Sequence, residues 1–345
     1  MKERIREPIR KPRFAAIALA AVVAASAALA SPAFASPAPA RPMCAVSDSF
    51  ESFLDLAQRT AGEPDDQQLS AFRQGYLAGH RDLYAPEVMP APSDKLALRT
   101  MAAVRAHPEW RALDAALRQA IQDVTERFGQ TFPDFRCNFP IYVTETFGTM
   151  DGAGRDVAGH PALVLGVDMI AEFETSAQLP VFLSHELFHR YNFQAAGFSD
   201  DLAERDVIWR SLWAEGLATY VSAKLNPSHP LSDALIFPRD LDSRAQPFIP
   251  QMAAELLAAA DRVDPANFAK FFESGSTDAQ HLGWPPRSGY YVGYLVAQDL
   301  GRRRTLAQLA HMRGPMLRAQ IGRSLERLAH GSRAGGSQIE QSGLE

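Results

Sequence analysis

The spacing of apolar residues divides the chain into helical stretches on both sides of a shorter, β-rich segment. Between residues 45 and 135, apolar side chains recur every three or four positions, as in DQQLSAFRQGYLAGHRDLY, which predicts amphipathic helices. The stretch 231–330 has a similar pattern, interrupted at the proline-rich GWPPRSGYY. The sequence therefore predicts an N-terminal helical region at 45–135 and a C-terminal helical region at 231–330.

The intervening segment, 136–230, mixes strand and helix patterns. FPIYVTETF (139–147) is rich in β-branched and aromatic residues, and ALVLGVDMI (162–170) is apolar on both faces, so both predict strands. The glycine-rich GTMDGAGRDVAGHP between them predicts turns. LPVFLSHELFHRYNFQAA and VIWRSLWAEGLATYVSAKL predict two largely apolar helices. The expected fold class is α+β and mostly helical, with a small sheet flanked by two helical regions.

Both ends of the chain fall outside this pattern. Residues 1–35 contain a basic start, an alanine-rich apolar run and an A-x-A signal at Ala33 and Ala35, which is the layout of a secretory signal peptide. We expect cleavage after Ala35, a Pro/Ala linker at 36–44, and an exported protein, periplasmic or secreted. The alternative is a membrane anchor, although about 17 mostly alanine residues are marginal for spanning a bilayer. The tail at 331–345 has no apolar content to fold around and is expected to be disordered.

The net charge limits the partners that the sequence predicts. The whole chain carries −5 and residues 1–35 carry +4, so the chain after cleavage carries −9. An acidic protein lacks the basic surface that binds nucleic acid or anionic lipid. No segment after residue 35 is long and apolar enough to span a membrane. We therefore expect no nucleic-acid partner and no integral membrane segment after cleavage.

The chain contains two cysteines, Cys44 and Cys137. An even number of cysteines in an exported protein predicts a disulfide. Such a bridge would tie the start of the mature chain to its middle. The alternative is two unpaired thiols, since two scattered cysteines are too few for a cysteine metal site.

The hexapeptide SHELFH carries two histidines and a glutamate at metal-binding spacing. His185 and His189 are four residues apart and share one helix face, where two imidazoles can reach one ion. Glu186 is beside His185, placed to take a proton from a water molecule, as in the H-E-x-x-H pattern. The flanking residues are apolar, and two histidines and a glutamate are costly in a buried helix unless they are paired. A zinc ion provides that pairing, whereas an ordinary helix that happens to carry two histidines does not.

A catalytic zinc ion takes three protein ligands, so the pattern requires one more. Asn192 and Ala195 stand where glycine and histidine would be in H-E-x-x-H-x-x-G-x-x-H, which excludes that class. Glu215 is the best candidate, because it is the one carboxylate in the apolar helix SLWAEGLATYVSA and needs a reason to be there. The alternatives are three loop carboxylates: Asp200, Asp201 and Glu204.

VFLSHELFHRYNF followed by LWAEGLATYVSA resembles the gluzincin group of zinc metallopeptidases, and most closely the uncharacterised "predicted Zn-dependent protease" families of bacteria. The resemblance covers roughly residues 139–225. It implies a zincin-like core with one zinc ion per chain and Glu186 as the general base. The implied zinc ligands are His185, His189 and Glu215. The 25 residues between the second histidine and Glu215 exceed the thermolysin-like spacing, which implies an inserted loop at about 194–206.

The resemblance also assigns a place to the strand ALVLGVDMI. In metallopeptidases of this type an edge strand precedes the zinc helix and pairs with an extended substrate by strand addition. ALVLGVDMI is in the right position along the chain for that role. A plain core strand is the alternative.

Peptide hydrolysis also needs a donor that stabilises the tetrahedral oxyanion. Tyr290 and Tyr291 begin a predicted helix after a proline-rich turn, with Arg287 and His281 just before it. We expect Tyr290 or Tyr291 to serve, with ordinary aromatic packing as the alternative. Three further histidines have no partner pattern and are interpreted as surface or core residues: His160, His229 and His311.

Together these observations predict an exported zinc-dependent peptidase that acts on a peptide or protein substrate. One alternative is an amidase that uses the same site on cell-wall peptides. Another is a non-catalytic binding or assembly protein that retains the fold. The sequence leaves the cleavage preference, endo- or exopeptidase action and the oligomeric state open.

Overall fold

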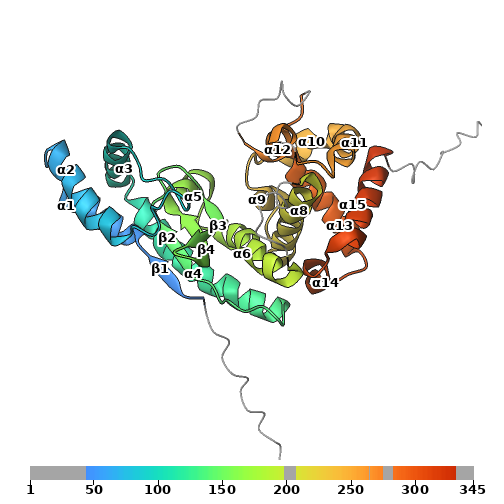
Figure 1. Ribbon diagram of the computed structural model, residues 1–345, viewed down its shortest axis with the longest axis horizontal. Helices are drawn as coiled ribbons and strands as arrows, with labels where there is room; N and C mark the ends of the chain where they lie inside the picture. Colours follow the sequence, from blue (N-terminus) through green and yellow to red (C-terminus); the bar gives the residue numbers. More distant parts are fainter. Residues whose placement is uncertain (1–43, 198–206, 264, 275–282, 332–345) are drawn as a thin grey trace, which may run out of the picture. The chain divides into compact units, whose positions relative to one another are not determined.

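The computed structural model describes residues 44–197, 207–263, 265–274 and 283–331 (Figure 1). The predicted signal peptide, nearly all of the linker and of the C-terminal tail, and the inserted loop beyond residue 197 lie outside the described residues. The described residues belong to one compact unit, so the helical regions on either side of the predicted core share its packing. No helix in these ranges has the length and hydropathy needed to cross a bilayer.

A four-stranded mixed sheet forms the β part of the fold, which confirms the α+β class. Its strands are β1 (Val46–Asp48), β2 (Ile141–Thr144), β3 (Gly152–Val157) and β4 (His160–Gly166). They are arranged in the order β1-β2-β4-β3. β1 and β4 run parallel to β2, whereas β3 is antiparallel to β4, with Gly152 opposite Leu165. The sheet therefore has β1 at one edge and β3 at the other.

Two of these strands were not predicted. The stretch 46–48 was included in a helical region, but it pairs in parallel with β2 because apolar helical periodicity begins only at Phe50. The stretch 152–157 was predicted as turns from its glycines, yet it forms a full antiparallel ladder with β4. A two-residue turn closes this hairpin, with φ values of 52° at Ala158 and 81° at Gly159. Two adjacent positive φ values are what a type I′ hairpin turn requires.

The predicted strand 162–170 was also too long. β4 ends at Gly166, and the helix α5 (Val167–Phe173) begins at once. A continuous apolar run has the same appearance in a buried strand and in a buried helix, so its pattern alone could not locate this change. β4 pairs with β2 on one side and β3 on the other, so the edge-strand interpretation is wrong and the alternative of a core strand is confirmed. The edge positions belong to β1 and β3.

Helices cover the sheet and account for most of the described chain (Figure 1). The N-terminal helices are α1 (Phe50–Arg59), α2 (Asp65–Ala71), the π-helix η1 (Phe72–Leu77), α3 (Asp94–Ala106) and α4 (Glu109–Thr131). The central helices are α6 (Leu179–Ala196) and α8 (Ile208–Leu225). The C-terminal helices are α9 (Leu231–Leu235), α10 (Leu241–Ala245), the 3₁₀-helix η2 (Gln246–Phe248), α11 (Ile249–Ala259), α12 (Pro265–Phe272), α13 (Ser288–Gly301), α14 (Leu306–Ala310) and α15 (Gly314–Ala329).

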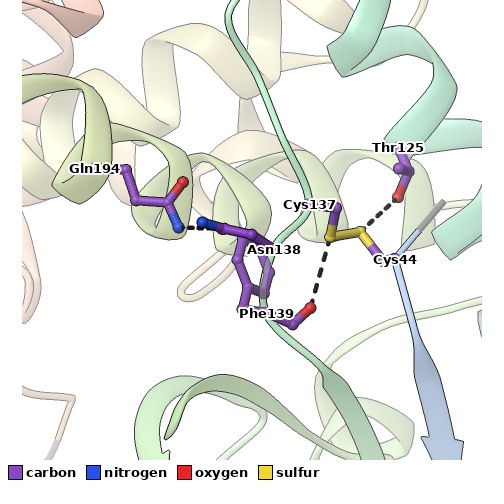
Figure 2. The surroundings of a disulfide bond; sticks show 6 residues. All are labelled: Cys44, Thr125, Cys137, Asn138, Phe139 and Gln194. Carbon is purple, nitrogen blue, oxygen red and sulfur yellow. Dashed lines mark hydrogen bonds between the residues drawn. A yellow bond between two sulfur atoms is a disulfide. The ribbon is translucent and has the colours of Figure 1, made fainter. Parts of the chain in front are cut away.

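A disulfide between Cys44 and Cys137 confirms the predicted bridge (Figure 2). It joins the residue before β1 to the segment that leads into β2, across 93 positions of sequence. The next residue, Asn138, accepts a hydrogen bond from Gln194 of α6 at 2.8 Å. The bridge therefore fixes the strand that starts the sheet close to the helix that carries SHELFH.

Two glycines allow α8 and α13 to approach each other closely. A Cβ atom on Gly216 of α8 would lie 2.1 Å from the carbonyl carbon of Gly293 in α13, and a Cβ on Gly293 would lie 2.4 Å from the carbonyl oxygen of Leu212. Real Cβ atoms do not approach other atoms so closely, so no larger residue fits at either position. This contact sets α13 directly beside the helix that carries Glu215.

Candidate metal centre

α6 is a buried helix that positions His185, Glu186 and His189. It contacts α4 and α8 as well as β3 and β4. Because neighbours surround it, apolar residues occur on every face and no polar stripe is needed. Pro180 is in its first turn, and Gly197 ends it with a left-handed φ of 62°. Residues of α6 itself therefore determine where the helix begins and ends. Its packing places His185 and Glu186 in the interior of the protein.

The side chains of His185 and His189 in α6 and Glu215 in α8 converge on one point. The two histidine Nε2 atoms are 3.0 Å apart. The Glu215 Oε2 atom lies 3.3 Å from the Nε2 of His185 and 3.4 Å from that of His189. Among the described residues, these are the three side chains whose ligand atoms lie close enough together to hold a metal ion. The two histidines of α6 and the glutamate of α8 therefore come together, as the sequence predicted.

The protonation states that burial favours suit metal binding. His185 is 2% exposed, and burial lowers its pKa, so its nitrogen keeps a free electron pair at neutral pH. Burial alone would raise the pKa of Glu215, but the adjacent His189 and His185 hold it well below its usual range. Metal ligands must be deprotonated. His185 and Glu215 therefore offer a neutral imidazole and a carboxylate as ligands.

The spacing of the three atoms also fits a small divalent ion. Tetrahedral bonds of about 2.0–2.2 Å separate ligand atoms by roughly 3.3 Å. The observed separations of 3.0, 3.3 and 3.4 Å agree with that value. Nitrogen and carboxylate donors suit zinc and other first-row divalent metals better than calcium or magnesium. The group could therefore hold a metal ion of that class.

Glu186 borders the same cavity but is not part of the ligand group. Its side chain is 8% exposed, and burial raises its pKa to about 8, while the charge of His189 opposes that shift. The carboxyl group lies against β3 at Gly152. A Cβ atom at Gly152 would be 2.6 Å from the Cδ of Glu186 and 2.8 Å from its Oε2. The absence of a side chain on this glycine therefore makes room for the carboxyl group.

Tyr290, in the first turn of α13, lies beside the group of His185, His189 and Glu215. Its ring is stacked on that of His185, with the centroids 6.2 Å apart and the planes at 17°. The guanidinium of Arg287 lies 4.0 Å from the centre of the Tyr290 ring and also donates to the carbonyl oxygen of Phe237 at 2.8 Å. Burial raises the pKa of the Tyr290 hydroxyl, so it remains protonated. A phenol and a guanidinium thus supply hydrogen-bond donors beside the three ligands.

Arg287 has a strained backbone. Its φ of 59° lies in the left-handed region, which residues with a Cβ rarely adopt. Such strain persists only where the surrounding structure determines it, and it is concentrated at functional sites. The conformation places the guanidinium in the cavity at the start of α13.

The structure does not bring Tyr291 to this site. Its hydroxyl donates to Gln246 at 2.9 Å, and its ring stacks on Tyr294. Of the two tyrosines expected to contribute, the structure brings Tyr290 alone to the ligand group. Successive residues of a helix point about 100° apart, so the two side chains could not both face one site.

Other sequence candidates lie elsewhere. His229 pairs with Asp233 at 3.0 Å, His311 pairs with Asp134 at 2.9 Å, and His160 is exposed at the start of β4. All three are exposed or partly buried, so of the two interpretations, surface or core, the surface one is the better description. Four candidates lie outside the described residues: Asp200, Asp201, Glu204 and His281.

The group of His185, His189 and Glu215 opens into a cavity of about 510 Å³. One wall consists of β3, from Gly152 to Asp156, and the opposite walls come from α6, α8 and the start of α13. Asp151 and the β3 wall were missed in the sequence, where this segment was taken for turns. The glycines at 152 and 154 weaken any strand pattern in GAGRDV, so the local sequence offered no signal for this wall.

Comparison with known protein families, with curated proteins and with solved structures gives no match for this chain. Its function is therefore argued from the geometry and donor chemistry of the site.

Proposed function

We propose that this chain is an exported, zinc-dependent peptidase of the gluzincin type. The observation that carries the proposal is the convergence of His185, His189 and Glu215, with ligand atoms 3.0 to 3.4 Å apart, in a cavity that also contains Glu186. Two histidines and a glutamate are the ligand set of one class of zinc hydrolases. The disulfide supports export, because disulfides persist in oxidising compartments.

In this proposal the protein's own groups carry the proton transfers. Zinc in such a site supplies Lewis-acid chemistry, activating water and polarising a carbonyl oxygen. The positive charge of a bound metal ion would lower the pKa of Glu186 from the value of about 8 that burial gives it and keep the carboxylate ionised. In that form Glu186 accepts a proton from the attacking water and later gives it to the leaving amine. The Tyr290 hydroxyl and the Arg287 guanidinium donate hydrogen bonds to the oxygen of the scissile carbonyl as it gains negative charge.

β3 gives the proposed substrate a place to bind. Within the described sheet this strand pairs with β4 on one side only, and it lines the cavity beside Glu186. An exposed strand edge binds an extended peptide through backbone hydrogen bonds, whatever its side chains. A peptide added to β3 would lie next to the ligand group. This arrangement supports a peptide or protein as the substrate.

The test is the substitution Glu186→Gln, measured beside wild type for metal content and for hydrolysis of a mixed peptide library. We expect the variant to keep its metal, because Glu186 is not a ligand, and to lose hydrolysis by at least about a hundredfold. The matched control is Glu126→Gln, an exposed glutamate in α4 outside this cavity, which should retain both properties. Hydrolysis by Glu186→Gln at the wild-type rate would exclude Glu186 as the base.

The same experiment separates the alternatives. Cleavage of cell-wall muropeptides without cleavage of the peptide library would identify an amidase that uses this site. Bound metal without turnover on either substrate set would favour a binding or assembly protein.

A further inference from the structure

Two matched contacts between α6 and β3 shape the cavity of the metal centre beyond Glu186. At Gly152, a Cβ atom would lie 2.6 Å from the Cδ of Glu186. At Gly154, two residues further along the strand, a Cβ atom would lie 2.9 Å from the Nη1 of Arg190. Residues two apart on a strand point to the same face. Glu186 and Arg190 therefore lie against the same face of β3.

The spacing of the two side chains along α6 agrees with the spacing of the two glycines along β3. Arg190 is four residues after Glu186, which is about 6 Å along a helix axis. Gly152 and Gly154 are separated by about 6.6 Å along a strand. The helix and the strand thus run in the same direction, and both side chains line the cavity. Along the strand, the cavity presents first a carboxyl group and then a guanidinium.

The surroundings of Arg190 suit the binding of a carboxylate. Its guanidinium lies 5.6 Å from the centre of the Phe139 ring, and the residue is partly buried. An aromatic contact restricts the side chain, and partial burial lowers the local dielectric, so a charge pair there is stronger than one in water. A guanidinium binds a carboxylate through two parallel hydrogen bonds.

The charges that line the cavity differ from the charge of the whole protein. The full chain carries −5, whereas the described lining contains four arginines and four carboxyl groups. A divalent ion held by the ligand group would give this lining two positive charges in excess. A positive cavity in an acidic protein attracts anionic substrates. The arginines are Arg155, Arg190, Arg210 and Arg287, and the carboxyl groups are those of Asp151, Asp156, Glu186 and Glu215.

A peptide that adds to the edge of β3 brings its side chains to Glu186 and Arg190 in turn. Directly opposite residues of paired strands have side chains on the same face, with Cβ atoms about 4.5–5.5 Å apart. The peptide residue opposite Gly152 therefore faces Glu186, and the peptide residue opposite Gly154 faces Arg190. The side chain of an aspartate or glutamate spans that distance. The C-terminal carboxylate of a peptide that ends there would meet the same guanidinium.

We propose, on the basis of the proposed function, that Arg190 selects peptide substrates with a carboxylate two residues away from the residue beside Glu186. The carboxylate belongs to an aspartate or glutamate side chain or to the C-terminus of the peptide. Both supply the same planar group, whereas a lysine or arginine at this position would meet a like charge. Arg190 determines specificity in this proposal and takes no part in the proton transfers.

Peptide binding to the Glu186→Gln variant tests the selection without turnover. Fluorescein-labelled, amidated octapeptides are compared by fluorescence polarisation in pairs that differ only in glutamate against glutamine, at each position in turn. A further pair of neutral peptides compares a free C-terminal carboxylate with its amide. We expect one register to favour the carboxylate by about tenfold or more, the range for a charge-assisted hydrogen bond. Preference for glutamate identifies a side chain as the source, and preference for the free terminus alone identifies the C-terminus.

Three arginine variants, each combined with Glu186→Gln, complete the binding test. Arg190→Gln should bring the ratio of affinities close to one, and Arg190→Glu should reverse it in favour of lysine over glutamine at the same position. Arg323→Gln, at an exposed position of α15 outside the cavity, should keep the original ratio. Thermal unfolding and metal content show that each variant is intact. Equal binding within every pair, an unchanged ratio in folded Arg190→Gln, or no binding of any peptide would overturn the proposal.

Hydrolysis of the same peptides by the wild type separates this proposal from the proposed function. A carboxylate preference in binding without cleavage of any peptide would support the role of Arg190 and contradict the peptidase. Cleavage without a carboxylate preference in binding would do the reverse. Where both hold, mass spectrometry of the products should place the carboxylate two residues from a residue that flanks the cleaved bond.

Discussion

The contact between Gly152 and Glu186 leads to a quantitative prediction for Gly152→Ala. Gly152 is not among the glycines with positive φ, so the backbone of β3 accepts alanine without strain. The new Cβ would lie 2.6 Å from the Cδ and Cγ of Glu186, whereas ordinary contacts begin at 3.4 Å. The carboxyl group must therefore move by at least about 0.8 Å. A displacement of about 1 Å in a reacting group costs roughly a hundredfold in rate.

Three measurements on Gly152→Ala test this displacement: the rate of hydrolysis, the metal content and the free energy of unfolding. Hydrolysis of the substrate cleaved by wild type should fall about a hundredfold in Gly152→Ala. Metal content should remain at the wild-type level, because Glu186 is not a ligand. Overpacking of this kind should also lower the free energy of unfolding by about 1–3 kcal/mol, which denaturant unfolding measures.

Gly154→Ala is the matched control in the same strand. Its Cβ would meet Nη1 of Arg190 at 2.9 Å, and Nη1 is the far end of a flexible side chain that can move away. We expect a small effect on hydrolysis, within a few fold of wild type. Wild-type rates in Gly152→Ala, with the variant folded and metal-loaded, would refute the position assigned to Glu186.

Two further predictions address the tyrosines and a buried acid. Tyr290→Phe should reduce hydrolysis by about 10²–10³-fold while the metal stays bound, because it removes a donor to the oxyanion. Tyr291→Phe should leave hydrolysis unchanged, and the kcat values of the two variants test this difference. The pKa of Asp114 is raised to about 7 by burial and by the charge of Asp48, despite the cation of Arg118. Ionisation therefore opposes folding. The stability that the neutral acid contributes is complete below about pH 4 and is lost as the pH rises through about 7. Relative to Asp114→Asn, wild type should lose about 2–4 kcal/mol of unfolding free energy over this range, measured by denaturant unfolding at each pH.

The sequence could predict the parts of the site that depend on the spacing of residues within one helix. His185 and His189 share a helix face because they are four residues apart, and any helix at that position brings them together. Glu215 was identifiable because a carboxylate in an apolar helix needs a partner. The geometry of the described residues brings all three together. The disulfide followed from the count of cysteines and the export signal.

The parts that sequence could not predict depend on contacts between distant segments. β3 has glycines that weaken any strand signal, and it forms because β4 pairs with it through a two-residue turn. The role of Gly152 depends on a carboxyl group 34 positions later in the chain, which no local pattern reports. Tyr290 and Tyr291 are equivalent in sequence, and the choice between them required the orientation of α13.

Metal content of the purified mature chain is the most direct test of the proposed centre. Mass spectrometry of wild type, prepared without chelator, is compared with His185→Ala and Glu215→Ala. His229→Ala serves as the control, because His229 pairs with Asp233 away from the ligand group. We expect one zinc ion per chain in wild type and in His229→Ala, and its loss from both ligand variants. Metal-free wild type, or zinc retained in full by both ligand variants, would contradict the assignment of His185, His189 and Glu215 as a metal centre.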